Sequence, residues 1–195
     1  MIYFTDKISL WFVQNNLIAS YNLDVFKYYL YRALSKICFY TSVFIVSIVL
    51  FRDNLLQSVA FITTLMLLRT RTGGYHLNNA DLCIVCSILL YIAGVYTSEY
   101  MVPNFSNSLL LILSLSSLMA IAKLAPINHP NLRLSKKEYS AMKVIVYRIC
   151  ICLSLGIVLL FILKLDIFYY TCCAIIVDII LIIAAKIAKQ ELKIK

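Results

Sequence analysis

Six apolar runs separated by short polar connections make up most of this 195-residue sequence. A helix needs about 20 apolar residues to cross a bilayer core of about 30 Å, and the runs approach or reach that length. They are residues 37–51, 55–68, 82–96, 109–124, 144–163 and 167–185. Apolar residues make up 63% of the chain and charged residues only 14%, whereas a soluble domain has roughly 45–50% and about 25%. The sequence therefore predicts an all-α integral membrane protein of about six transmembrane helices, with no separate soluble domain.

The charges in the connections predict how these helices are oriented. Cytoplasmic connections of membrane proteins carry an excess of Lys and Arg. Basic residues cluster before the first run, in the second and fourth connections, and after the last run, whereas each other connection carries at most one, balanced by an aspartate. We therefore predict six spans with both chain ends, and the connection at residues 69–80, on the cytoplasmic side. The net charge of +9 follows this pattern, so we expect contacts with membrane lipids and no nucleic-acid partner.

The first 35 residues differ from the rest of the chain. Polar side chains alternate with aromatic and aliphatic ones from residue 8 to residue 34, and no signal-peptide pattern precedes them. This composition is typical of one or two amphipathic helices at the membrane interface, although a surface for an amphipathic partner is an alternative. We divide a single membrane domain, 1–195, into an amphipathic interfacial segment (1–35), transmembrane helices (36–187) and a basic cytoplasmic tail (188–195).

The connection at residues 69–80 contains a predicted sharp turn. Gly73 and Gly74 are half of the four glycines in the chain, and a glycine pair permits positive φ angles and close backbone approach. The turn comes just before His76. Asn78 or Asn79 is a suitable N-cap for the helix that follows, so the chain is expected to leave one helix and begin the next within this connection.

Positive charge gathers around Cys83, near the expected first turn of that next helix. The helix dipole, Arg69, Arg71 and a protonated His76 all favour a thiolate there. On one continuous helix His76 and Cys83 would lie about 10.5 Å apart along the axis, but a base must come within about 2.6–3.2 Å of its nucleophile. A catalytic His–Cys pair therefore requires the predicted break between them. The alternative is a loop histidine beside a structural cysteine.

Cys86 forms a Cys-x-x-Cys motif with Cys83. Such a motif is found in redox pairs and in zinc sites, but no second Cys/His pair is nearby to complete four ligands. We expect no metal and no cofactor, and we interpret Cys86 as a helix-packing residue. A membrane thiol oxidoreductase that uses Cys83 and Cys86 remains an alternative function.

Asp178 is a carboxylate within the last apolar run, where charge is costly and marks functional or helix-pairing positions. We expect it to pair with a neighbouring helix near mid-depth, away from the His–Cys pair. A small transporter or permease, with Asp178 on its path, is a second alternative function. His129, in the fourth connection, is expected to be a solvated loop residue.

The stretch Arg69-x-Arg-x-Gly-Gly-x-His76, followed seven residues later by Cys83, resembles the accessory gene regulator protein B (AgrB) family, bacterial membrane cysteine endopeptidases of quorum sensing. The length, the amphipathic N-terminus, the six apolar segments and the basic fourth connection are similar too. The resemblance implies that His76 is the base and Cys83 the nucleophile. Candidates for contacts with the substrate or the oxyanion are Arg69, Arg71, Gly73 and Gly74.

The resemblance also implies a substrate and a reaction. The substrate is an autoinducer pro-peptide with an amphipathic leader and an acidic tail, processed by a homodimer at the cytoplasmic face of the bacterial cell membrane. His76 takes the proton of Cys83, and the thiolate releases the tail and keeps the rest as a thioester. A Cys or Ser of the peptide then attacks the thioester and closes a thiolactone or lactone ring.

Overall fold

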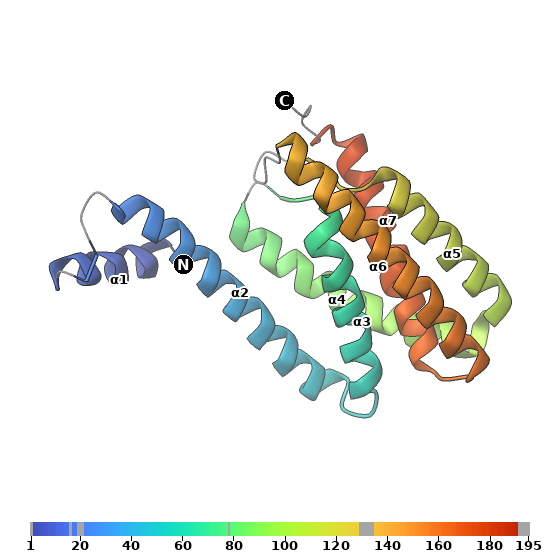
Figure 1. Cartoon of the computed structure of the whole chain (residues 1–195). Helices are drawn as coiled ribbons and strands as arrows, with labels where there is room; N and C mark the ends of the chain where they lie inside the picture. Colours follow the sequence, from blue (N-terminus) through green and yellow to red (C-terminus); the bar gives the residue numbers. More distant parts are fainter. Residues whose placement is uncertain (1, 16, 19–21, 78, 129–134, 191–195) are drawn as a thin grey trace.

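The computed structural model describes residues 2–15, 17–18, 22–77, 79–128 and 135–190. Within these residues the chain forms seven α-helices and no strand (Figure 1). They are α1 (Ile2–Gln14), α2 (Leu23–Leu50), α3 (Leu55–Thr72), α4 (Ala80–Asn104), α5 (Asn107–Leu124), α6 (Lys136–Ile162) and α7 (Ile167–Ile187). The predicted all-α class is confirmed, and so is the break at residues 52–54 between the first two apolar runs.

Five of the described helices, α2, α4, α5, α6 and α7, are long and apolar enough to cross a membrane. The remaining predicted crossing is α3, which has 18 residues and ends in a polar turn that carries Arg69 and Arg71. Large apolar side chains on the outer helices, such as Phe44, Leu89 and Leu155, are exposed. Lipid covers such surfaces, so the chain is a membrane protein.

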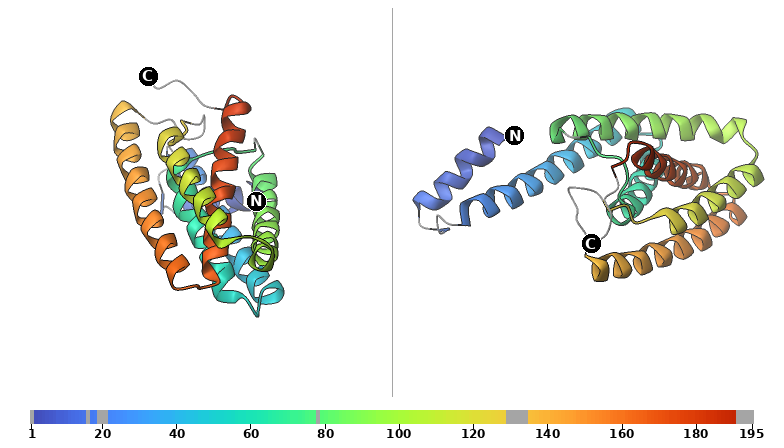
Figure 2. Two further views of the ribbon diagram at one scale, coloured as in Figure 1. Left: turned by 90° about the vertical axis from the view of Figure 1, so that its right-hand side faces the viewer. Right: turned by 90° about the horizontal axis from the view of Figure 1, so that it is seen from above.

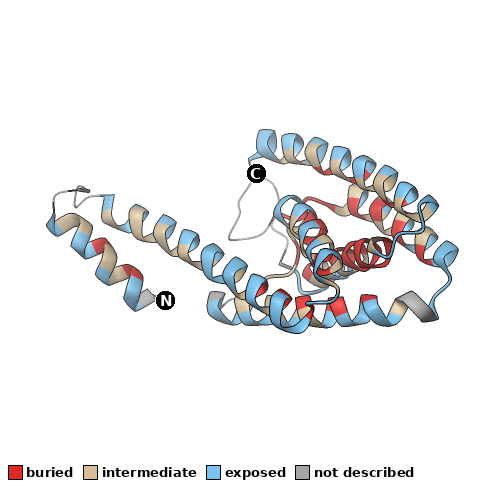
Figure 3. Ribbon diagram, turned by 90° about the horizontal axis from the view of Figure 1, so that it is seen from below, coloured by how far each residue is buried: buried red, intermediate tan, exposed pale blue. Residues whose placement is uncertain are grey.

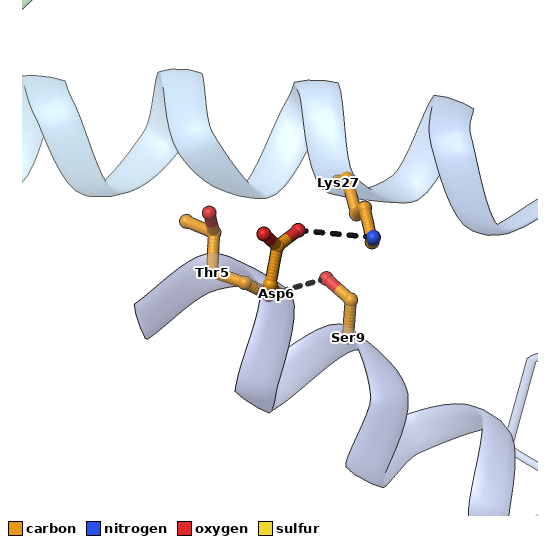
Figure 4. Close-up of polar contacts among 4 residues, drawn as sticks. All are labelled: Thr5, Asp6, Ser9 and Lys27. Carbon is orange, nitrogen blue, oxygen red and sulfur yellow. Dashed lines mark hydrogen bonds and ion pairs between the residues drawn. The ribbon is translucent and has the colours of Figure 1, made fainter. Parts of the chain in front are cut away.

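Helix α1 and the first part of α2 form a hairpin that projects from the bundle (Figures 1 and 2). Lys27 Nζ lies 2.9 Å from Asp6 Oδ1 (Figure 4), and the rings of Phe12 and Phe26 pack with centroids 5.2 Å apart. The division expected at residue 35 has no counterpart as a helix end, because α2 runs without interruption from Leu23 to Leu50. No Gly or Pro interrupts this stretch, so backbone hydrogen bonds continue from the amphipathic part into the apolar part.

Helix α7 is the central helix of the bundle. It packs against α3, α4, α5 and α6, and most of its residues are buried (Figure 3). Aromatic side chains such as Phe61, Tyr91 and Phe168 fill one part of the core. Aliphatic ones such as Ile121 and Ile182 fill the other. Helices α3, α4, α5 and α6 thus share α7 as their common partner, whereas α2 packs against α3 and α4.

One end of the bundle gathers three segments that are far apart in the sequence. The Ile127 N–H donates to the Thr72 carbonyl at 2.9 Å, and the Tyr75 N–H donates to the Leu181 carbonyl at 3.0 Å. The connections after α3 and α5 and the end of α7 therefore lie together, as the alternation of loop charges requires. The side of the membrane that this end faces remains a prediction.

Candidate active site at the start of helix α4

The glycine pair makes the turn that the sequence predicts. Gly73 has φ +74° and Gly74 has φ +114°, a region that other residues rarely adopt. A Cβ added at Gly73 would lie 3.0 Å from the Ile127 carbonyl oxygen, and one added at Gly74 would overlap the Arg69 guanidinium and lie 3.3 Å from the Leu181 oxygen. Both the backbone angle and the close packing therefore require glycine here.

Arg69 and Arg71 occupy different surroundings although both lie in the last turn of α3. The half-buried Arg69 donates from Nη1 to the Gly73 carbonyl and from Nη2 to the Tyr75 carbonyl. Arg71 is exposed. Both arginines are candidates for contacts with the substrate or the oxyanion. Arg69 instead uses its guanidinium to hold the loop, whereas the side chain of Arg71 is accessible from outside the protein.

Asn79 begins helix α4. Its side-chain oxygen accepts from the N–H groups of Asp81, at 3.0 Å, and Leu82, at 3.2 Å. The Cys83 N–H donates to the Asn79 carbonyl at 3.0 Å, which places Cys83 in the first turn. The prediction of an N-cap is confirmed for Asn79, whereas Asn78, like His129 in the fourth connection, lies outside the described residues.

The helix break brings His76 and Cys83 together. His76 Nδ1 lies 3.9 Å from Cys83 Sγ, and both side chains are half-buried. This distance is within reach of a hydrogen bond to sulfur but is longer than the contact of about 2.6–3.2 Å that proton transfer needs. Catalytic hydrogen bonds are often longer without substrate than in the substrate complex. The arrangement has the parts that an activated thiol needs, namely a sulfur nucleophile at a helix N-terminus and an imidazole beside it.

Gln190, a residue that sequence reasoning missed, contacts the backbone of His76 twice. The His76 N–H donates to Gln190 Oε1 at 3.0 Å, and Gln190 Nε2 donates to the His76 carbonyl at 2.8 Å. Gln190 belongs to the segment that the sequence suggested was a basic tail. No local pattern relates two residues that are 114 positions apart.

Asp178 is fully buried and accepts from Thr72 Oγ1, at 3.3 Å to Oδ1 and 3.2 Å to Oδ2. This contact joins α7 to α3, as expected for a helix-pairing carboxylate. Asp178 nevertheless lies closer to the candidate site than the sequence indicated, because Thr72 directly precedes the glycine turn. Arg69 is close enough to both Asp178 and Cys83 to interact with them electrostatically, so Asp178 belongs to the surroundings of the loop.

Cys86 lies one turn after Cys83 on α4 and is exposed. It does not pack between helices as expected, because this position faces away from the bundle. Every described cysteine is free. Among the described residues, no three His, Cys, Asp or Glu side chains lie close enough together to hold a metal ion.

Comparison with known proteins identifies a family for this chain. The model of the family described as accessory gene regulator B matches residues 5–187, which include the loop, His76, Cys83 and Asp178 and end three positions before Gln190. No curated protein and no solved structure matches the chain.

Proposed function

This chain belongs to the accessory gene regulator B (AgrB) family, which takes part in quorum-sensing peptide processing, and we propose that it acts there as a membrane-embedded cysteine endopeptidase. The observation that carries the proposal is the 3.9 Å contact between His76 Nδ1 and Cys83 Sγ at the start of α4. We place this pair at the cytoplasmic face of the bacterial cell membrane, where the loop charges put it. As the resemblance implies, the enzyme works as a homodimer.

His76 is the base that activates Cys83. Its Nδ1, unprotonated in the resting enzyme, accepts the thiol proton, and the imidazolium that forms then stabilises the thiolate. The N-terminal dipole of α4 favours the same negative charge. Arg69 adds positive charge to the site, while its two hydrogen bonds to loop carbonyls fix the turn that carries His76.

Cleavage separates the acidic tail from the autoinducer segment of the pro-peptide. The Cys83 thiolate attacks the carbonyl carbon at this junction, a C–S bond forms, and the C–N bond breaks. His76 donates its proton to the departing amine, so the tail leaves with a neutral amino terminus. The exposed Arg71 is suited to bind the carboxylates of the tail, and Gly73 and Gly74 let the backbone approach the substrate closely.

Ring closure completes the reaction. A Cys or Ser side chain of the bound peptide attacks the thioester, forms the thiolactone or lactone, and releases the Cys83 thiol. Water must be kept away because it would hydrolyse the same thioester. The half-buried position of Cys83 supports this requirement.

The N-terminal hairpin is suited to the membrane interface. Exposed aromatic side chains lie on α1 and on the first part of α2, among them Trp11, Tyr28 and Tyr29. Aromatic residues of this kind favour the headgroup region. We place α1 there, on the same membrane surface at which an amphipathic leader would bind.

The test uses the protein in lipid vesicles with the pro-peptide encoded by a short open reading frame beside its gene. Cys83→Ala and His76→Ala should each abolish release of the acidic tail, and mass spectrometry should find an acyl-enzyme at Cys83 in the parent protein. Cys86→Ala, one turn away and exposed, is the matched control and should retain cleavage. Retained cleavage in Cys83→Ala would refute the proposal, and loss in Cys86→Ala would favour the thiol oxidoreductase.

A further inference from the structure

The side chain of Gln190 pairs with both backbone groups of the histidine in the candidate site. Its amide oxygen accepts from the His76 N–H at 3.0 Å, and its amide nitrogen donates to the His76 carbonyl at 2.8 Å. A primary amide and a peptide unit match in this way because each offers one donor and one acceptor. Two simultaneous contacts restrict rotation of the His76 backbone, which one contact would not.

The backbone that carries Gln190 is itself fixed at the end of α7. The Lys189 N–H donates to the Lys186 carbonyl at 3.1 Å, and the Gln190 N–H donates to the Ala185 carbonyl at 3.0 Å. Lys189 has φ +53°. These features define a Schellman motif, in which the residue with positive φ ends the helix and the next one is tied back to it. The Cα atom of Gln190, from which its side chain extends, is therefore held in a fixed position.

A second contact from α7 supports the residue before His76. The Tyr75 N–H donates to the Leu181 carbonyl at 3.0 Å, and on its other side the Tyr75 carbonyl accepts from Arg69. Helix α7 and its end thus contact two successive residues of the loop. Gln190 extends this support to the residue whose imidazole faces Cys83.

We propose that Gln190 is a positioning residue for the His76–Cys83 pair, and that the end of α7 is therefore part of the active site. The inference rests on the proposed function. The two hydrogen bonds from Gln190 are to the backbone of His76, so Gln190 acts on catalysis by setting where the imidazole lies. A shift of about 1 Å in a reacting group can cost about 100-fold in rate, so loss of this amide should lower kcat by about 10- to 100-fold and leave KM nearly unchanged.

The first experiment compares Gln190→Ala, Gln190→Glu and the remote control Gln57→Ala in lipid vesicles. Gln57 lies in the first turns of α3, at the opposite end of that helix from Arg69. Tail cleavage is measured at saturating and at limiting pro-peptide. Separately, alkylation of Cys83 by iodoacetamide is followed across pH without peptide, and peptide mass spectrometry resolves Cys83 from the other six cysteines.

The alkylation profile separates positioning from a purely structural role. In the proposed mechanism His76 accepts the proton of the Cys83 thiol, so loss of the pair should move the alkylation midpoint to higher pH. Gln190→Ala should show this shift together with the fall in kcat. Gln190→Glu has nearly the same shape but cannot donate to the His76 carbonyl, so it should shift in the same direction. Gln57→Ala should match the parent in both measurements.

A second pair of variants tests the backbone turn that orients the Gln190 side chain and leaves Gln190 itself unchanged. Lys189→Gly keeps the positive φ that the Schellman motif needs and should retain cleavage. Lys189→Pro cannot adopt that φ, so it should reproduce the defect of Gln190→Ala. Equal activity of the glycine and proline variants would contradict a positioning role.

The two proposals fail in different ways. If Gln190→Ala and Gln190→Glu match the parent in kcat and in the alkylation profile while Cys83→Ala and His76→Ala are inactive, Gln190 has no positioning role and the peptidase stands. If Gln190→Ala unfolds, the isosteric Gln190→Glu decides by its alkylation profile. If His76→Ala itself cleaves normally, the proposed function falls, whatever the Gln190 variants do.

Discussion

Among single residues, the two arginines that precede the loop show how the same side chain takes different roles two positions apart. Arg69 reaches two loop carbonyls with two nitrogens of one planar group. It also interacts with the buried Asp178. Arg71 is exposed on α3. A guanidinium can hold two acceptors in a fixed geometry, whereas the lysine ammonium acts as a single flexible charge.

This difference predicts the effect of charge-conserving substitutions. Arg69→Lys should lower the rate of tail cleavage by at least about 10-fold, because one ammonium cannot replace both hydrogen bonds and the turn before His76 loosens. Arg71→Lys keeps a positive charge that can bind the acidic tail, so the rate of tail cleavage should fall less. Its main effect should be a higher KM. The measurement is the rate of tail cleavage by the two variants at saturating peptide. An equal fall in this rate for Arg69→Lys and Arg71→Lys would contradict the assigned roles.

Local sequence patterns predict some of the site residues. The glycine turn, the Asn79 cap and the proximity of His76 to Cys83 follow from rules that act over a few positions. The Thr72–Asp178 and His76–Gln190 contacts join residues 106 and 114 positions apart. Such contacts depend on how α7 packs against α3, and no spacing in the chain encodes that packing.

At the level of secondary-structure elements, Gly94 determines how closely α4 approaches α3. A Cβ added at Gly94 would overlap the ring of Phe61, which is fully buried. The Gly94 carbonyl also accepts a hydrogen bond from Cys173 Sγ at 3.6 Å, so α7 meets the same point. Gly156 of α6, in contrast, has open space within 4 Å of an added Cβ.

The different surroundings of Gly94 and Gly156 predict opposite effects of a glycine-to-alanine substitution on stability. Gly94→Ala should destabilise the protein by about 1–3 kcal/mol, the usual cost of overpacking a core. Gly156→Ala should leave stability unchanged or raise it by up to about 1 kcal/mol, because alanine favours helix. Thermal unfolding in detergent would test both, and a stabilised Gly94→Ala would show that α3 and α4 lie further apart.

The single tryptophan of the chain, Trp11, reports on α1 alone. Its side chain is 55% exposed on the hairpin. If α1 lies at the membrane interface, its fluorescence in vesicles should be quenched most by lipids brominated near the headgroup and less by those brominated at the chain end. Quenching by aqueous acrylamide to the level of free tryptophan would contradict this location.

The boundaries of the elements were predicted unevenly. Breaks appear where polar residues or glycines interrupt apolar runs, as between α2 and α3 and between α3 and α4. The division at residue 35 between an interfacial and a transmembrane segment stays a prediction; α2 runs through this position because the polar side chains of residues 23–36 do not disturb its backbone hydrogen bonds. The polarity of the side chains indicates whether water, the membrane interface or lipid surrounds a helix. It does not indicate where the helix ends, because one helix can pass from one of these surroundings into another.

The whole molecule is a bundle in which one end carries the candidate site. The segments after α3 and α5 meet there, joined to each other and to α7 by backbone hydrogen bonds, and the Gln190 side chain adds the segment after α7. The sequence predicted that these segments share one face. It did not predict that α7 is central: α6 and α7 are almost equally apolar, yet α6 mainly faces outward and α7 is mostly buried. In a membrane both lipid and protein accept apolar side chains, so hydropathy cannot distinguish the two.

The predicted orientation can be checked with two exposed positions at opposite ends of the bundle. A membrane-impermeant maleimide should label Asp53→Cys, between α2 and α3, in intact cells. It should label Lys137→Cys, at the start of α6, only in inverted vesicles, because the loop charges put that end inside. The reverse pattern would place the His76–Cys83 pair outside the cell and contradict a cytoplasmic site.

Helix α7 follows in the chain every helix that we describe as packed against it. A chain is made from its N-terminus at about 5–20 residues per second, and its N-terminal parts fold first. Helices α3, α4 and α5 are therefore made before the helix that packs against all three. If His76 and Gln190 act as we propose, Cys83 has no positioned base until α7 and Gln190 have joined the bundle. The proposed peptidase would then be inactive in the nascent chain until α7 has packed.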